Sequence, residues 1–403
     1  MKTNEQPQAF PPSITGKGAE STGSVYDHKF GAGDPYTLGV EEEYQLLDGE
    51  SFDLVQHIET MLAAISGHEL EPRINPELMQ SVIEITTPVC RNAGDVQREL
   101  VKLRGYVTEV ARERGMRVGS AGTHPFSLFE RQRITAKDRY RALIDQMQYV
   151  ARRELIFGMH VHVAVDDPEK AIQVVNGLLP QLAPLLALSA SSPFWRGEPT
   201  GLASSRQMVF SAFPRSGPPP RFRDYTDYAE VVGQLERSGC IADYTYIWWD
   251  IRLHPRLGTV EIRICDAVTR VEDAVAIAAF CQALVKQLSE RYHEREEIPS
   301  YHRILTTENK WLAARYGLAA PVMDLASGRR NRVPIARLVR RTLAEIEPHA
   351  RELGSERELE GIAAILGRGS SSDRQLRIYD TNRDIVEVAR EIAEATELLP
   401  VSV

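Results

Sequence analysis

Four segments of this sequence alternate between apolar and other residues with a period of two, as β-strands do when they bury one face. They are Leu38–Leu47, Gln80–Pro88, Ile156–Val165 and Thr259–Cys265. In each segment, apolar side chains fall on one side and ionisable side chains on the other. We therefore expect the four strands to pair in one antiparallel sheet, with the apolar faces packed beneath helices.

The ionisable rows of these strands would meet on the second face of the sheet. This face gathers Glu41, Glu43, Glu84, Glu261, His160, His162 and Arg263. A solvated sheet face is also polar, but glutamate is disfavoured in strands, so its repetition favours a functional site. Two carboxylates about 6 Å apart repel by roughly 3 kcal/mol at an effective dielectric of 20, so the cluster needs protons, solvent or a cation. Oxygen ligands select Mg²⁺ or Mn²⁺, and Arg263 beside them suits an anionic substrate or a transferring phosphoryl group.

The rest of the chain reads mostly as helices, with no clear linker. Residues 1–35 are rich in Gly, Pro, Ser and Thr and lack apolar periodicity, which predicts a flexible N-terminal tail. Residues 36–403 then form a single domain, rich in strands to about residue 268 and mostly helical after it. Among the helices we expect Phe52–Ser66, Asp95–Arg114 and Lys137–Arg153. The predicted fold class is α+β, with helices on one face of the sheet.

Charge and composition argue against several classes of partner. Asp and Glu number 56 against 48 Lys and Arg, and the formal net charge of −8 makes nucleic acid an unfavourable partner. The longest apolar stretch, residues 177–190, contains two prolines and is too short to cross a membrane, so no membrane partner is expected. The N-terminus lacks the apolar core of a signal peptide, and the four cysteines show no paired spacing. These features predict a cytoplasmic protein.

The pair His160-x-His162 leaves a second function open. Both rings project from one strand face, as in the metal-binding pair of zinc hydrolases, so a zinc-dependent hydrolase is the alternative. The sequence contains neither a P-loop nor a strand-linked G-x-G-x-x-G motif. A nucleotide would therefore have to be held by metal ions and side chains.

Seven short motifs stand in order between about Tyr36 and Tyr379. They are Leu38-Gly-Val-Glu-Glu-Glu-Tyr44, Ser81-Val-Ile-Glu-Ile-Thr-Thr-Pro88, Gly122-Thr-His-Pro125, Gly158-Met-His-Val-His-Val163, Gly258-Thr-Val-Glu-Ile-Arg263, Glu308-Asn-Lys-Trp311 and Arg368-Gly-Ser-Ser-Ser-Asp-Arg-Gln375. Together they resemble the type 2 glutamate–cysteine ligase family of ATP-dependent carboxylate–amine ligases. The resemblance covers nearly the whole chain outside the predicted tail.

The resemblance implies a glutamine-synthetase-like catalytic fold with a curved, mainly antiparallel sheet. It also implies that the carboxylate of glutamate, or of a related acid, is joined to an amine such as cysteine. The reaction would pass through an acyl phosphate, consume ATP with Mg²⁺ or Mn²⁺, and release ADP and phosphate. The family further suggests a homodimer.

The resemblance also assigns roles to individual residues, several of which the alternation had already selected. Arg263 and His160 would act in catalysis, Arg263 at the transferring phosphoryl group and His160 as a metal or phosphate contact. The implied metal ligands are Glu41, Glu43, Glu77, Glu84, Glu261 and His160. Candidate ATP contacts are Arg206, Arg368 and Gln375, whereas His124 and His162 match their motifs without a role.

The loop Arg206–Arg223 and the aromatic segment Tyr244–Asp250 are candidates for the acceptor site, although packing at a sheet edge explains the aromatic residues equally well. A non-catalytic binding module is a third possibility, which the presence of all four strand glutamates disfavours.

Overall fold

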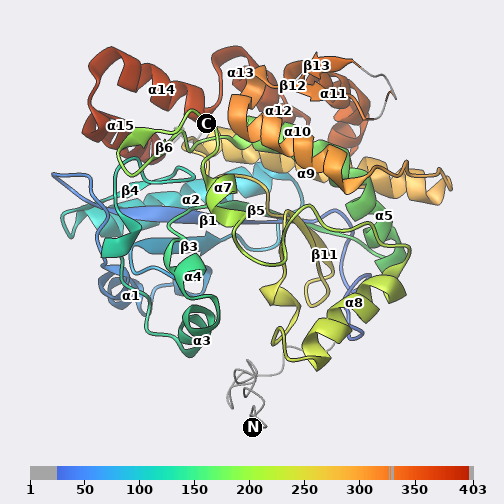
Figure 1. Ribbon diagram of the computed structural model, residues 1–403, viewed down its shortest axis with the longest axis horizontal. Helices are drawn as coiled ribbons and strands as arrows, with labels where there is room; N and C mark the ends of the chain where they lie inside the picture. Colours follow the sequence, from blue (N-terminus) through green and yellow to red (C-terminus); the bar gives the residue numbers. More distant parts are fainter. Residues whose placement is uncertain (1–24, 326, 328–330, 399–403) are drawn as a thin grey trace, which may run out of the picture.

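The computed structural model describes residues 25–325, 327 and 331–398, and its centre is one antiparallel sheet (Figure 1). The strand order is β10-β11-β5-β1-β3-β2, and β4 pairs with β1 beside this path. The predicted strands correspond to β1, β3, β5 and β11, which confirms that all four share one sheet. The strands of the sheet are β1 (Leu38–Asp48), β2 (Ile74–Pro76), β3 (Val82–Thr86), β4 (Met116–Gly119), β5 (Met159–Ala164), β10 (Ile251–His254) and β11 (Thr259–Ile262).

Helices and three small two-stranded sheets surround this centre. The small sheets pair β6 (Phe194–Trp195) with β7 (Glu198–Pro199), β8 (Ser216–Gly217) with β9 (Trp248–Trp249), and β12 (Pro321–Met323) with β13 (Arg332–Pro334). The helices are α1 (Ile58–Ile65), α2 (Ala93–Arg112), α3 (Asp138–Met147), α4 (Tyr149–Arg152), α5 (Pro168–Leu178), α6 (Leu182–Ser189), α7 (Arg206–Phe210), α8 (Tyr225–Arg237), α9 (Val271–His293), α10 (Arg303–Tyr316), α11 (Ile335–Glu352), α12 (Glu356–Leu359), α13 (Gly361–Arg368), α14 (Ser371–Asn382) and α15 (Ile385–Glu397). The α+β fold class with a mainly antiparallel sheet is therefore confirmed.

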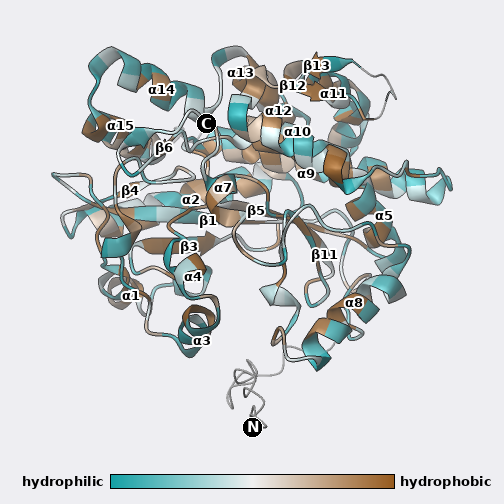
Figure 2. Cartoon of the chain, in the orientation of Figure 1, coloured by the Kyte–Doolittle hydropathy of each residue, from teal (hydrophilic) through white to brown (hydrophobic). Residues whose placement is uncertain are grey.

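The apolar face of the sheet packs against α2, α5 and α9. Val40, Ile85, Val161 and Val260 alternate toward this face and belong to one buried cluster with side chains of the three helices. In Figure 2 the hydrophobic colour concentrates along the strands, while outward turns of the peripheral helices are hydrophilic. Burial of the apolar rows fixes the register, because a slip of one residue would turn them to the other face.

Glu42 is the charged exception on the apolar face. It is fully buried, and Arg104 of α2, also buried, donates from Nε to its carboxylate at 3.0 Å. The Tyr44 hydroxyl donates to the same carboxylate, and Arg104 donates to the carbonyl of Thr269 at 2.9 Å. This ion pair ties β1, α2 and the start of α9 together through the core.

The packed chain begins earlier than predicted. Residues 25–35 were expected to belong to the flexible tail, but Val25 and Phe30 are buried, and the Lys29 amide donates to the Pro255 carbonyl at 2.8 Å. Two apolar side chains five residues apart create no periodicity, and their partners lie more than 190 residues away in sequence. The tail prediction for residues 1–24 lies outside the described residues.

Two further expectations differ from the structure. The single helix expected over Lys137–Arg153 is divided into α3 and α4 at Gln148, whose φ of +48° is incompatible with a continuous helix. The apolar segment treated as too short for a membrane is part of a longer helical stretch, Pro168–Ser189, which meets the length and composition of a membrane span. In this fold, 78% of its apolar window is buried, because it packs in the core.

We predict that Arg104→Met lowers the free energy of unfolding by about 3–5 kcal/mol, because it leaves the Glu42 carboxylate buried without its cation. Urea unfolding followed by circular dichroism measures the change. The double variant Glu42→Leu/Arg104→Met should recover most of the loss. Arg98→Met on the exposed side of α2 is the matched control, and an equal loss there would contradict the prediction.

Candidate active site

Strand register brings the ionisable rows together on the face opposite α2 and α9. Glu41 of β1 lies opposite His160 of β5, and Glu43 lies opposite Glu84 of β3. Glu261 of β11 lies opposite His162 in the same way. Because all of these pairings are antiparallel and adjacent, β1, β3 and β11 bring their acids, and β5 its histidines, to one region.

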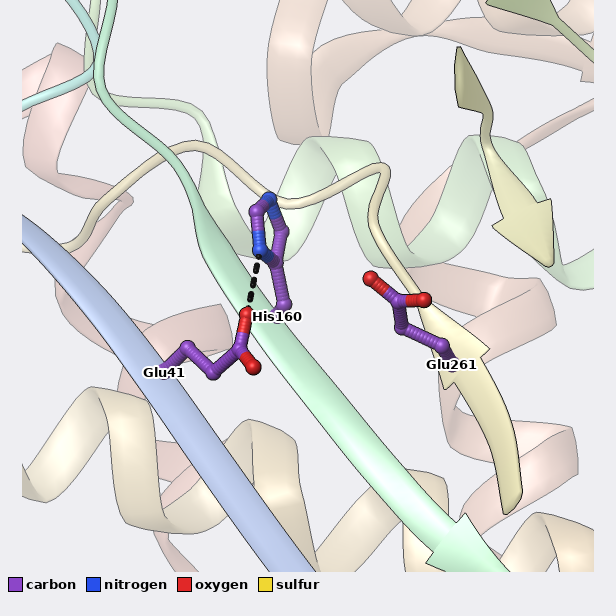
Figure 3. A group of neighbouring side chains, drawn as sticks. All are labelled: Glu41, His160 and Glu261. Carbon is purple, nitrogen blue, oxygen red and sulfur yellow. Dashed lines mark hydrogen bonds and ion pairs between the residues drawn. The ribbon is translucent and has the colours of Figure 1, made fainter. Parts of the chain in front are cut away.

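The first cluster consists of Glu41, His160 and Glu261 (Figure 3). One ligand atom from each residue lies within 4.8 Å of the others, and His160 Nδ1 is 3.0 Å from Glu41 Oε2. Arg252 binds Glu261 with two N–H groups, at 2.8 and 3.1 Å, and Arg263 also donates to Glu261. The first cluster therefore already contains balancing positive charge.

The second cluster consists of Glu43, Glu77 and Glu84, whose oxygens also lie within 4.8 Å of one another. Glu77 follows β2, so the sheet edge supplies the third carboxylate. Within the described part of the chain, no Lys or Arg forms an ion pair with any of the three. Glu43 accepts the Gly158 amide and Glu77 accepts the Leu78 amide, which compensates only partly for burial.

The pKa values of the carboxyls differ between the two clusters in the same way as their ion pairs do. Burial opposes ionisation in both clusters, but His162 beside Glu41 and Arg252 beside Glu261 hold the pKa of each carboxyl well below its ordinary value. In the second cluster, burial and mutual repulsion raise the pKa of Glu43 to about 7 and that of Glu84 well above its ordinary value. The second cluster thus needs protons or a cation, and its all-oxygen donor set fits a hard divalent ion.

Both clusters face one cavity of about 490 Å³. Arg206 and Arg263 line it, and both carry a buried Nε–H for which the described residues provide no acceptor. An unpaired buried donor is costly, so these two N–H groups are available to donate to an anion in the cavity. The remaining walls include Glu154, Lys137, Arg139, Tyr140, Thr245, Tyr246, Trp248, Phe210 and Arg252.

Two glycines of the sequence motifs make room for the Arg206 side chain and its partner. A Cβ at Gly158 would collide with the Arg206 guanidinium, and one at Gly122 would collide with Asp266. Asp266 is fully buried, lies 3.9 Å from Arg206, and accepts the Ser192 hydroxyl at 2.7 Å and the Ser204 hydroxyl at 2.9 Å. The glycines therefore allow a fixed carboxylate to hold Arg206 at the cavity wall.

Most of the residues selected from the sequence meet here. The cavity is lined by Glu41, Glu43, Glu77, Glu84, His160, Arg206 and Arg263, while Glu261 and His162 lie directly behind it in contact with Glu41 or its partners. The expected acceptor segments also contribute, because Phe210, Thr245, Tyr246 and Trp248 belong to the wall.

Arg368, Gln375 and His124 lie elsewhere. Arg368 pairs with Asp273 of α9 at a separate cavity of about 220 Å³, and the buried Gln375 amide donates to the Ser191 carbonyl at 2.8 Å. The structure therefore does not bring these two predicted ATP contacts to the carboxylate clusters. His124 is buried, and its ring bonds to backbone groups, accepting the Ser127 amide at 2.9 Å, so it has a structural role.

Several cavity residues were missed from the sequence. Arg252 could have been found, because it faces Glu261 across the predicted hairpin. Glu154 follows α4 in a loop, and its pKa is raised by burial and by Glu43, but no periodicity marks it. Lys137 and Arg139 lie at the start of α3, and in the sequence nothing distinguishes them from ordinary surface charges.

Two solved structures share this fold. A glutamate–cysteine ligase from Francisella tularensis, determined in complex with AMP, aligns with a TM-score of 0.64 at 12% identity, over 90% of this chain and 89% of that one. A bifunctional glutathione synthetase from Pasteurella multocida aligns with a TM-score of 0.66 at 16% identity, over 90% of this chain and 52% of that one.

Sequence relatives agree with the structural likeness. A protein from Rubrobacter xylanophilus, provisionally named glutamate–cysteine ligase 2-1, is 44% identical over 363 residues, or 90% of this chain and 95% of the relative. A protein from Sorangium cellulosum, provisionally named glutamate–cysteine ligase 2, is 43% identical over 364 residues, or 90% and 96% of the two chains. The model of glutamate–cysteine ligase family 2 matches residues 37–395. The chain therefore belongs to glutamate–cysteine ligase family 2.

Proposed function

We propose that this protein uses ATP to join the carboxylate of glutamate, or of a related acid, to an amine such as cysteine. The observation that carries the proposal is the pairing of two acidic clusters with Arg206 and Arg263 around one cavity. Family membership and the AMP-bound structural relative support ATP as the second substrate. A cytoplasmic location and a homodimer stay predictions.

The proposed reaction explains why acids and arginines share a site. A carboxylate is a poor electrophile, so its oxygen first attacks the γ-phosphorus of ATP, the bond to ADP breaks, and an acyl phosphate forms. The amine then attacks the acyl carbon, phosphate leaves with the bonding electron pair, and the amine proton passes to solvent. Arg206 and Arg263 would donate N–H groups to the transferring phosphoryl group, and Arg263 would also stabilise the tetrahedral oxyanion.

The clusters would hold Mg²⁺ or Mn²⁺. The first cluster offers Glu41, Glu261 and His160, and the second offers Glu43, Glu77 and Glu84. Burial and the nearby Arg263 lower the pKa of His160 to about 4, so its ring is neutral near pH 7 and keeps a lone pair for a metal or a phosphate proton. When bound, the metal ions supply positive charge that offsets the triphosphate.

The zinc-hydrolase alternative finds less support in the geometry. Among the described residues, no candidate metal group contains both histidines of the His160-x-His162 pair. His162 instead bonds through Nδ1 to the Thr259 hydroxyl at 3.0 Å and lies 3.3 Å from Glu41. The carboxylate-rich groups favour a hard cation over zinc.

The direct test incubates the purified protein with Mg²⁺, ATP, glutamate and a panel of amines including cysteine. We expect ADP to form only when an acid is present, and mass spectrometry to find an amide product. ADP formation should survive a zinc-selective chelator. Hydrolysis of an amide or ester without ATP, lost on zinc removal, would instead establish the alternative.

We predict that Glu41→Gln and Glu84→Gln each reduce the kcat for ADP formation by roughly 100-fold or more, because each removes a charged ligand from one cluster. Glu50→Gln, at an exposed position after β1, is the control and should retain wild-type kcat. Circular dichroism verifies folding. Unchanged ADP formation in either folded variant would refute the metal role of that cluster.

We also predict how pH and metal ions affect stability. The Glu43 carboxyl is protonated more readily in the folded state than in the unfolded chain, so the metal-free protein should lose stability relative to the Glu43→Gln variant as the pH rises from about 4.5 to about 7. Saturating Mg²⁺ or Mn²⁺ should reverse this loss, by about 2.7 kcal/mol at 100 times Kd. Thermal unfolding across this pH range, with and without metal, measures both effects, and Glu84→Gln should weaken them. A metal-free protein whose stability changes with pH in the same way as that of the Glu43→Gln variant would contradict the assignment.

A further inference from the structure

Two exposed cations that line the cavity lack the carboxylate partners that its other cations have. Arg252 and Arg263 pair with Glu261, and Arg206 lies beside Asp266. Lys137 and Arg139, at the start of α3, also line the cavity. Within the described ranges, neither lies within ion-pair distance of a carboxylate. The two side chains therefore bring positive charge to the cavity that no described carboxylate pairs with.

Arg139 is held in place although it is exposed. Its Nη2 donates to the Thr245 hydroxyl at 3.0 Å, and its guanidinium lies over the Tyr246 ring, 4.9 Å from the centroid. The Thr245 hydroxyl and amide both donate to Asp243, so the hydroxyl oxygen is oriented to accept from Arg139. These contacts fix the guanidinium and use few of its five N–H donors.

The position of α3 places Lys137 and Arg139 close to the acidic clusters. Tyr140, next to Arg139, donates its hydroxyl to the Pro76 carbonyl at 3.0 Å, directly before Glu77 of the second cluster. Arg139, Lys137 and Glu77 all line the same cavity, so the two cations and the second cluster act on one space. A small acid with one carboxylate at Arg263 and the clusters would extend its other end within the same cavity.

We propose that Arg139, assisted by Lys137, binds a second carboxylate of the acid substrate, the one that is not activated. The inference rests on the proposed function and assigns to Arg139 the recognition of the part of the acid that does not react. A planar guanidinium with free N–H groups matches a carboxylate in a bidentate geometry. A nucleotide phosphate is also an anion that an arginine can bind. The phosphates already have other groups to bind them, namely the unpartnered N–H donors of Arg206 and Arg263 and the two acidic clusters with their metal ions.

The test compares glutamate with 4-aminobutyrate, which is glutamate without its α-carboxylate. The variant is Arg139→Met, which keeps an unbranched side chain against Tyr246 but removes the charge. We expect kcat/KM for glutamate to fall by about 10- to 100-fold, mainly through KM, because a hydrogen bond to a charged group is lost. The value for 4-aminobutyrate and the KM for ATP should change by less than about threefold, since neither depends on that contact.

Arg141→Met is the matched control, because Arg141 lies on the same helix, pairs with Asp138 and does not line the cavity. It should leave all constants unchanged. Arg139→Lys should restore part of the preference for glutamate. A rise in the KM for ATP alone would assign Arg139 to the nucleotide, and equal losses for both acids would indicate a structural role; either result overturns the inference.

Calorimetric binding of glutamate separates this inference from the proposed function. If the wild type binds glutamate but forms no ADP, and Arg139→Met weakens binding at least tenfold, the inference stands and the ligase proposal fails. If the wild type forms ADP with glutamate and Arg139→Met binds glutamate equally well, the ligase proposal stands and the inference fails.

Discussion

The arrangement of charged side chains in this structure depends on the electrostatic cost of gathering carboxylates on one half-buried sheet face. Each acid of the first cluster has a cation or a histidine beside it, and Arg252 reaches Glu261 from the neighbouring strand. The same rule holds on the opposite face, where Arg104 neutralises Glu42 in the core. The second cluster and the neighbouring Glu154 are exceptions within the described chain, and their raised pKa values show where positive charge is missing.

Strands and connecting segments have different tasks around the cavity. Register within the antiparallel sheet sets the relative positions of the acidic clusters, and backbone hydrogen bonds make this arrangement stiff. The segments outside the sheet supply the other side chains of the cavity wall: Arg206 from α7, Arg139 from α3, and the aromatic residues around Tyr246. With this division, the sheet keeps the acidic clusters in a constant arrangement, while the connecting segments determine which acid and which amine fit the cavity.

Sequence reasoning succeeded where a short-range rule decides the outcome. The two-residue period placed Glu41, Glu84 and Glu261 on one face, and antiparallel pairing then brought them together. It failed where distant contacts decide: residues 25–35 pack because Tyr225 and Pro255 receive them. Arg368 and Gln375 belong to a motif that reads as functional, yet their partners are Asp273 and the Ser191 carbonyl.

The sequence by itself determined which strands form the sheet, which face of the sheet carries the acids, and the family. Alternation and ordered motifs can be recognised from short stretches of sequence, without knowledge of distant contacts. Only the tertiary structure decided that the acids form two clusters of unlike charge balance and that Arg252 and Asp266 support the site. It also decided that Arg139 lines the cavity without a carboxylate partner among the described residues. Charge compensation depends on distances between side chains that are far apart in sequence. Those distances exist only after the segments between the strands have packed.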